Sequence, residues 1–123
     1  MDFSSGDRNY AAAREKFHLP LPGTFNFAFD VVDDWAARDD RTAVIAVSRD
    51  GETVRRIAYS EFSESSNRLA VALLGLGAGP GDFACVVVGR VPAWYTVLFG
   101  CMKAGVTSMP GTLVAIRLNW LRT

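Results

Sequence analysis

A glycine-rich loop, GLGAGPGD from Gly75 to Asp82, has the clearest potential for chemistry in this 123-residue chain. Such loops bind phosphate when they follow a strand and open a helix, because free N–H groups at the helix N-terminus then face the anion. Here the order is reversed: a helical pattern precedes the loop, and a continuous apolar run typical of a buried strand follows it. We therefore interpret the loop as a helix end, with Gly77 and Gly79 in left-handed positions and Pro80 stopping the helix. A phosphate cradle is the alternative.

Charged side chains form two further groups that could carry chemistry. Asp30, Asp33 and Asp34 lie close together in one expected helix and could serve a metal ion or catalysis. Carboxylates in the first turns of a helix are more often solvated and stabilised by the helix dipole, and we favour that interpretation. Arg55 and Arg56 are adjacent in an expected strand, so they point to opposite faces of the pleat and make a two-arginine anion clamp unfavourable.

The cysteines and the histidine indicate no metal site. Cys85 and Cys101 lie in apolar runs, and we expect both to be small core residues in a reducing compartment. His18 is the only histidine, which excludes a histidine-rich zinc site. The sequence has no G-x-S-x-G or Walker motif and no nucleophile with a base beside it. We therefore assign no catalytic, cofactor-binding or metal-ligating residue.

Composition narrows the class of protein further. The 13 basic residues balance the 13 acidic ones, so no net field favours nucleic acid or an anionic membrane. Hydrophobic residues make up 50% of the chain, which argues against disorder, and no apolar run is long enough to cross a bilayer. The N-terminus has acidic residues and no apolar core, so we expect neither a signal nor a transit peptide, and a cytoplasmic location.

The first half of the chain predicts an arm, a helix and a hairpin. Residues 1–24 have the composition of an arm that ends in a proline-rich loop. Asn26 would cap a helix to about Arg38, with an apolar stripe on one face and the aspartates outside. Asp50-Gly51 is a strong turn motif between two strands. The apolar stripe of the helix consists of Phe29, Val32, Trp35 and Ala36. The two expected strands are Ala43–Val47 and Val54–Tyr59.

The second half predicts a strand–helix–strand unit with parallel strands, so the fold class is α/β. A helix from Ser60 to Leu76 precedes it, and the first strand, from Phe83, is apolar on consecutive positions and should be covered on both faces. Ligands of such sheets bind beyond the carboxyl ends of the strands, here Gly89-Arg90 and Pro110–Thr112. The second helix starts at Pro92 and is ended by Lys103 and Gly105, and the last strand is Val106–Met109. The apolar stripe of this second helix consists of Trp94, Val97, Leu98, Cys101 and Met102.

Several strings in this order resemble one known family. They are FNFAFDVVDDWA (25–36), YSEFSESSNRLAVAL (59–73), LGAGPGD (76–82), GRVPAWY (89–95) and GCMKAGVTSMPGT (100–112). The chain is similar over about residues 25–112 to the N-terminal part of adenylate-forming acyl-CoA synthetases, most of all their medium-chain branch. Each string alone is weak, but their common order and spacing are specific. The resemblance implies an N-terminal α/β subdomain with a hairpin and a βαβ unit packed by helices.

The resemblance also implies a chemistry for the parent enzyme. Such ligases activate a carboxylic acid with ATP to an acyl-adenylate and pyrophosphate, then pass the acyl group to coenzyme A, with Mg²⁺ steadying the phosphates. The family's phosphate loop, nucleotide contacts and catalytic lysine match nothing here, so no site residue is carried over. Ala93 replaces a usual acidic residue, and from Leu113 the similarity stops, with Val114 about where the medium-chain branch has a glutamine near coenzyme A.

Two hypotheses follow for the chain as a whole. In the first, residues 1–24 are an arm, 25–112 an N-terminal α/β subdomain and 113–123 a divergent tail of a truncated or frameshifted synthetase, inactive by itself. In the second, the chain is a free-standing, non-catalytic α/β module that binds a ligand or partner. The first also predicts self-association, because the last strand leaves an unpaired hydrogen-bonding edge. Neither predicts a nucleic-acid partner or a membrane span.

Overall fold

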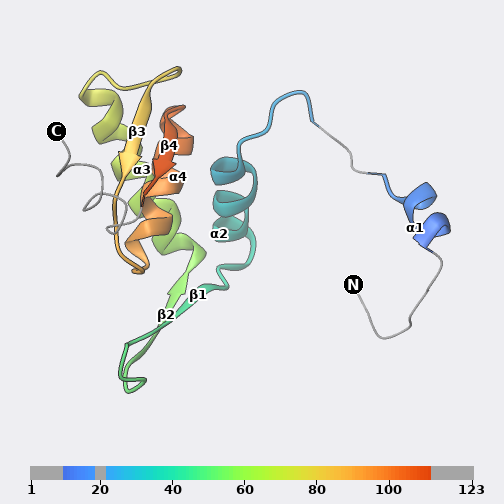
Figure 1. Cartoon of the computed structure of the whole chain (residues 1–123), viewed down its shortest axis with the longest axis horizontal. Coiled ribbons are helices and arrows are strands. Elements are labelled where there is room, and N and C mark those ends of the chain that lie inside the picture. Colours follow the sequence, from blue (N-terminus) through green and yellow to red (C-terminus); the bar gives the residue numbers. More distant parts are fainter. Residues whose placement is uncertain (1–9, 19–21, 112–123) are drawn as a thin grey trace, which may run out of the picture.

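The computed structural model describes residues 10–18 and 22–111 (Figure 1). Residues 1–9 and 19–21 of the arm, Thr112 and the tail 113–123 lie outside this part. No helix in the described part is long and apolar enough to cross a membrane. The elements are α1 (Tyr10–Lys16), the π-helix η1 (Ala28–Asp33), α2 (Asp34–Asp39), β1 (Thr42–Val47), β2 (Val54–Ala58), α3 (Tyr59–Gly75), β3 (Phe83–Val86), α4 (Ala93–Ala104) and β4 (Thr107–Pro110).

The predicted hairpin is confirmed. Strands β1 and β2 pair antiparallel, with an irregularity in register between Thr42 and Val44. Gly51 adopts φ 78° in the turn, a conformation that costs glycine little because it has no Cβ. The hairpin extends away from the helices in Figure 1 and leads directly into α3.

The second pair of strands confirms the βαβ unit. β3 and β4 are parallel, with Phe83 opposite Thr107 and Cys85 opposite Met109, and α4 connects them. The expectation that β3 is covered on both faces is wrong for the described residues. Helices α3 and α4 lie on one side of this sheet in Figure 1, and Phe83 on the strand is 67% exposed. Cys85 is likewise exposed, so its assignment to the core is wrong, whereas Cys101 is buried.

The glycine-rich loop is a helix end, as predicted. The N–H of Gly77 donates to the Leu74 carbonyl (3.0 Å) and that of Ala78 to the Leu73 carbonyl (3.0 Å), the Schellman pattern. Gly77 is left-handed at φ 86°, as expected, but the second left-handed position is Gly81 at φ 96°. The left-handed assignment of Gly79 is wrong, because its N–H donates to Asp82 Oδ2 (2.8 Å) in a local turn that needs no positive φ.

The first core helix forms where expected but with a different buried face. Asn26 caps it, since its Oδ1 accepts from the Ala28 N–H (3.0 Å). The first turns are π-helical, so residues four and five apart share a face, and Ala28 is buried together with Val32. The prediction for Phe29 is wrong: its ring is 48% exposed.

Within the described residues the core has two clusters, the first of which joins α3 to α4. One contains Ala70, Cys101, Ala104 and Val106, and the other contains Val32, Ile57 and Phe62. Gly100 of α4 lies against Leu69 of α3, where a Cβ on Gly100 would come within 2.9 Å of the Leu69 Cβ. Met102 was expected on the buried stripe but is 38% exposed, because α4 turns its small residues rather than its longest ones toward α3.

Candidate functional site

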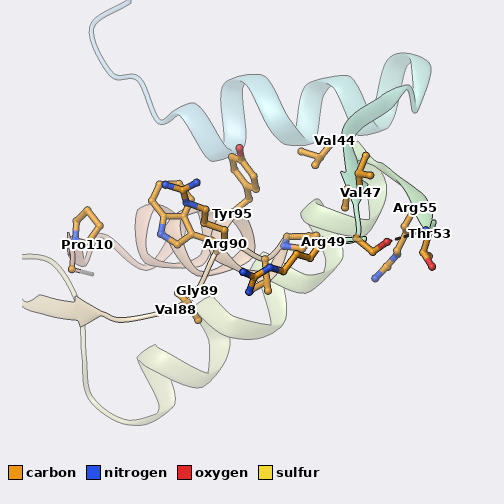
Figure 2. Close-up of a pocket in the computed structure, with 16 residues that line it drawn as sticks. Val44, Val47, Arg49, Thr53, Arg55, Val88, Gly89, Arg90, Tyr95 and Pro110 are labelled. Atoms are coloured by element: carbon orange, nitrogen blue, oxygen red, sulfur yellow. Dashed lines mark hydrogen bonds between the residues drawn. The ribbon is translucent and has the colours of Figure 1, made fainter. Parts of the chain in front are cut away.

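A cavity of about 1100 Å³ lies between the β1–β2 hairpin and the loops that follow β3 and β4. The two loops expected to hold a ligand, Gly89-Arg90 and Pro110-Gly111, both line it; Thr112 is outside the described residues. Figure 2 shows β1 residues Val44 and Val47 at one side and Val88 and Gly89 at another. The carboxyl ends of the two parallel strands and the hairpin therefore bound one space, the place where α/β sheets bind ligands.

Local hydrogen bonds hold the loops at this cavity. The Gly111 N–H donates to the Val86 carbonyl (2.9 Å), which keeps the chain beside β3 after β4 ends. The Val91 N–H donates to the Gly89 carbonyl (2.8 Å), a tight turn that precedes Pro92 at the start of α4. Proline suits that place because the first helical N–H groups have no partner within the helix. The turn after β3 is thus held by a backbone hydrogen bond and by the proline that opens α4.

The hairpin turn is also held by its own side chains. The Ser48 hydroxyl donates to the Asp50 carboxylate and accepts from the Thr53 N–H (2.9 Å). The hydrogen bond from Ser48, followed by that from the Glu52 N–H, lowers the pKa of Asp50 below 3.8. The Asp50 carboxylate is therefore bonded within the turn. The neighbouring Arg49 lines the cavity.

Among the described residues, the lining is apolar apart from a few polar side chains, and its charged members are arginines: Arg49, Arg55 and Arg90. Arg55 Nη2 donates to Glu61 Oε2 (2.7 Å), and this bond is the main reason that the pKa of Glu61 lies below 4.5. Neither Arg49 nor Arg90 forms an ion pair within the described part of the chain. None of the described residues that line the cavity is an Asp or a Glu. Arg56 is absent from the lining although Arg55 belongs to it, consistent with opposite faces of β2.

Of the three aspartates in the first core helix, Asp33 departs from the prediction that it is solvated, because it pairs with a buried lysine. Asp33 Oδ1 accepts from Lys103 Nζ (2.6 Å), whose side chain is 1% exposed, and Lys103 Nζ also donates to Asn67 Oδ1 (2.7 Å). Asp34 pairs with Arg38 on the surface, as the dipole interpretation allows. Among the residues described, no group of three or more His, Cys, Asp or Glu could hold a metal ion.

Sequence reasoning missed Arg49 and the role of Lys103. Arg49 lies 41 positions before Arg90 in the numbering, and no local pattern indicates that the two line one cavity. Lys103 was expected only as a helix-ending residue, whereas its charge pairs with a carboxylate far away in the sequence. Cys101 is unsuited to nucleophilic chemistry, because burial raises the pKa of its thiol and keeps it protonated.

Comparisons with solved structures identify the class of fold. The fatty acid AMP ligase of Legionella pneumophila superposes with a TM-score of 0.64 at 21% identity, over 69% of this chain and 15% of that protein. The N-terminal subdomain of NpsA from Klebsiella oxytoca has a TM-score of 0.54 at 26% identity, over 68% of this chain and 20% of that one. The fold is that of the N-terminal subdomain of adenylate-forming ligases.

Sequence comparison identifies the family. Residues 32–112 match the model of the AMP-binding enzymes. The rat protein named acyl-coenzyme A synthetase ACSM2, mitochondrial, is 39% identical over 77% of this chain, but this chain spans only 18% of that relative. The chain belongs to the AMP-binding enzyme family, and the resemblance to acyl-CoA synthetases is confirmed.

Proposed function

We propose that this chain is the N-terminal segment of an ATP-dependent acyl-CoA synthetase. The parent enzyme would convert a carboxylic acid, ATP and coenzyme A to acyl-CoA, AMP and pyrophosphate, with Mg²⁺ on the phosphates. The observation that carries the proposal is the 39% identity to a named acyl-CoA synthetase over 77% of this chain, and the family model that matches residues 32–112 supports it. Medium-chain or aromatic acids are the proposed substrates of the parent.

The segment is proposed to be inactive by itself. Acyl-adenylate formation needs groups that hold the triphosphate and neutralise the charge that develops during transfer. No phosphate loop or catalytic lysine is recognisable in the sequence, and the glycine-rich loop presents the carbonyl end of α3 to its surroundings. Carbonyls carry the negative end of the helix dipole and do not favour phosphate.

The test is an adenylation assay on the 123-residue chain and on a fusion that adds the remaining part of a related synthetase. We expect the chain alone to release no pyrophosphate above a no-enzyme control when ATP and octanoate are present. We expect the fusion to release pyrophosphate only when the acid is added. Acid-dependent release by the chain alone would contradict its inactivity, and a folded but inert fusion would contradict the synthetase proposal.

A free-standing, non-catalytic module is the second candidate, favoured by the cavity that residues 44–111 form without any other chain. The two candidates differ in self-association. As part of a larger protein, the segment would leave Phe83 and Met109, which are 67% and 48% exposed, beside an unpaired strand edge. We then expect oligomers in sedimentation at micromolar concentration. A monodisperse monomer with cooperative unfolding would favour the free-standing module.

Boundaries and location are proposed on the same basis. We propose an arm over residues 1–24, the α/β subdomain over 25–112 and a divergent tail over 113–123, which limited proteolysis would test through cleavage near residues 24 and 112. A cytoplasmic location is also a prediction. The rat relative carries "mitochondrial" in its name, so cell fractionation of the tagged chain is the direct measurement.

A further inference from the structure

The outer edge of β3, on the side away from β4, carries unpaired backbone groups. On the inner side, the Thr107 N–H donates to the Asp82 carbonyl (2.8 Å) and the Gly111 N–H to the Val86 carbonyl (2.9 Å). Because backbone groups alternate in direction along a strand, every second residue of this stretch directs its N–H and C=O away from β4. These residues are Phe83, Cys85 and Val87, and their N–H groups have no partner within the described residues.

The outer edge of β4 offers fewer donors. Pro110 has no N–H, and the Val106 N–H donates to the Cys101 carbonyl at the end of α4 (2.9 Å). Between these two positions, Ser108 is the residue whose N–H points outward. A proline at a sheet edge hinders the addition of another strand, so the edge of β3 is the better template for pairing.

Charges at the two ends of β3 fit the same edge of a second copy. Asp82 before the strand and Arg90 after it are exposed, and neither forms an ion pair within the described residues. In an antiparallel pair centred on Cys85, Asp82 of one copy lies opposite Val88 of the other. The diagonal neighbour two residues further on is Arg90, whose long side chain reaches that distance. Parallel pairing would bring like charges together, so the charges favour the antiparallel arrangement.

We propose that the outer edge of β3 pairs antiparallel with the same edge of a second copy, with Cys85 on the twofold axis. The same surface then serves both copies, and the outward N–H and C=O groups of each strand satisfy those of the other. The proposal rests on the proposed function, in which this chain is a segment of a larger protein. Acid-dependent pyrophosphate release by the fusion tests that function without using this edge, so the two proposals can fail separately.

Sedimentation equilibrium of the whole 123-residue chain, followed by oxidation, tests the arrangement. We expect a dimer at micromolar concentration. Directly opposed residues of a hydrogen-bonded antiparallel pair have Cα atoms about 5.5 Å apart, within the range that a disulfide spans. Copper phenanthroline, which removes one electron and one proton from each thiol, should therefore join Cys85 to Cys85 of the second copy and leave the buried Cys101 reduced. A monomer, an oligomer larger than a dimer, or a dimer that forms no Cys85 disulfide would overturn the proposal.

Charge reversal separates this dimer from non-specific association. D82K and R90E each place like charges across the interface and should raise the dissociation constant of the dimer about tenfold, whereas R56E, the matched control on β2, should change it less than about twofold. An equimolar mixture of D82K and R90E restores both ion pairs in a heterodimer, which should bind within about threefold of the parent chain. If D82K does not fold, the comparison of R90E with R56E keeps the test decisive. Equal effects of R90E and R56E, or no recovery in a mixture of folded variants, would overturn the proposal.

Discussion

The two ends of α4 place basic side chains in opposite situations. Near the C-terminal end, the Lys103 side chain is 1% exposed and donates to Asp33 on η1 and Asn67 on α3. Just before the N-terminal end, Arg90 is exposed at the cavity and has no ion pair within the described residues. Lys103 is paired within the protein, whereas Arg90 has no ion pair among the described residues.

The difference follows from the cost of burying charge. An ammonium group removed from water is tolerated only with a carboxylate and further hydrogen-bond acceptors nearby, so Lys103 ties three helical elements together. An exposed guanidinium keeps its hydration and needs no internal partner. Buried and closely packed contacts such as that of Lys103 should therefore matter more for stability than exposed charges such as Arg90, and the predictions below test or sharpen that contrast, from the largest expected effect to the smallest.

Removing the carboxylate partner of Lys103 should have the largest effect. Asp33→Ala leaves the buried ammonium without its counter-charge and should lower the free energy of unfolding by about 3 kcal/mol. Asp39→Ala is the matched control, since it breaks an exposed pair with Arg41 and should cost less than about 1 kcal/mol. Urea titration followed by circular dichroism measures both. Equal costs would remove the contrast between buried and exposed basic residues, and D33A/K103M should recover part of the loss.

The close contact between α3 and α4 should be the next most sensitive point. Gly100→Ala places a Cβ within 2.7 Å of Leu69 Cδ2 and 2.9 Å of Leu69 Cβ, so the helices must separate. We expect a loss of about 1–2 kcal/mol after the helix-favouring effect of alanine is included. Gly75→Ala has no atom within 4 Å of the new Cβ and should be neutral or slightly stabilising. Thermal unfolding of the two variants would contradict the packing argument if their midpoints were equal.

Two glycines of the glycine-rich loop, Gly77 and Gly79, should differ in how much an alanine costs, and the expected difference in stability is smaller than at Gly100. Gly77→Ala forces a side chain into φ 86° and should cost about 1 kcal/mol. Gly79 has no positive φ and nothing within 4 Å, so Gly79→Ala should be close to neutral. Chemical unfolding compares the pair directly. A larger loss for Gly79→Ala than for Gly77→Ala would contradict the observed helix end.

The smallest expected effect concerns pH. The bond from Arg55, and then that from the Ala58 N–H, hold the pKa of Glu61 below 4.5 in the folded chain. The unfolded chain therefore binds the proton more readily, so the Glu61 contribution to stability is full above about pH 4.5 and is lost as pH falls through the lower folded pKa. The difference in unfolding free energy between the parent chain and Glu61→Gln should shrink over that range. Glu64→Gln, in an exposed pair with Arg68, is the control; a Glu61 difference constant with pH would contradict the linkage.

Much of the fold was predictable because its determinants are local. The Asp50-Gly51 turn needs only its own side chains and a glycine with positive φ, and the hairpin forms as expected. The end of α3 needs only Gly77 and the carbonyls of the preceding turn. Errors began where the local rule was incomplete: the π-helical turns of η1 exposed Phe29, and a turn through Asp82 removed the need for a left-handed Gly79.

The sequence by itself indicated the described elements from the helix after Asn26 to β4, the end of α3 and the family, because periodicity, turn residues and motif order are properties of neighbouring positions. It did not indicate α1 (Tyr10–Lys16), which lies within the residues expected to form an arm. It also indicated the two loops, Gly89-Arg90 and Pro110-Gly111, that line the cavity. Only the tertiary structure brought Arg49 to the same cavity and Asp33 to Lys103, which is 70 positions away in sequence. The physical reason is that the partner of a charge depends on which helices and strands pack together. That packing is set by the shape of the whole core, from Gly100 against Leu69 to Val32 beside Phe62.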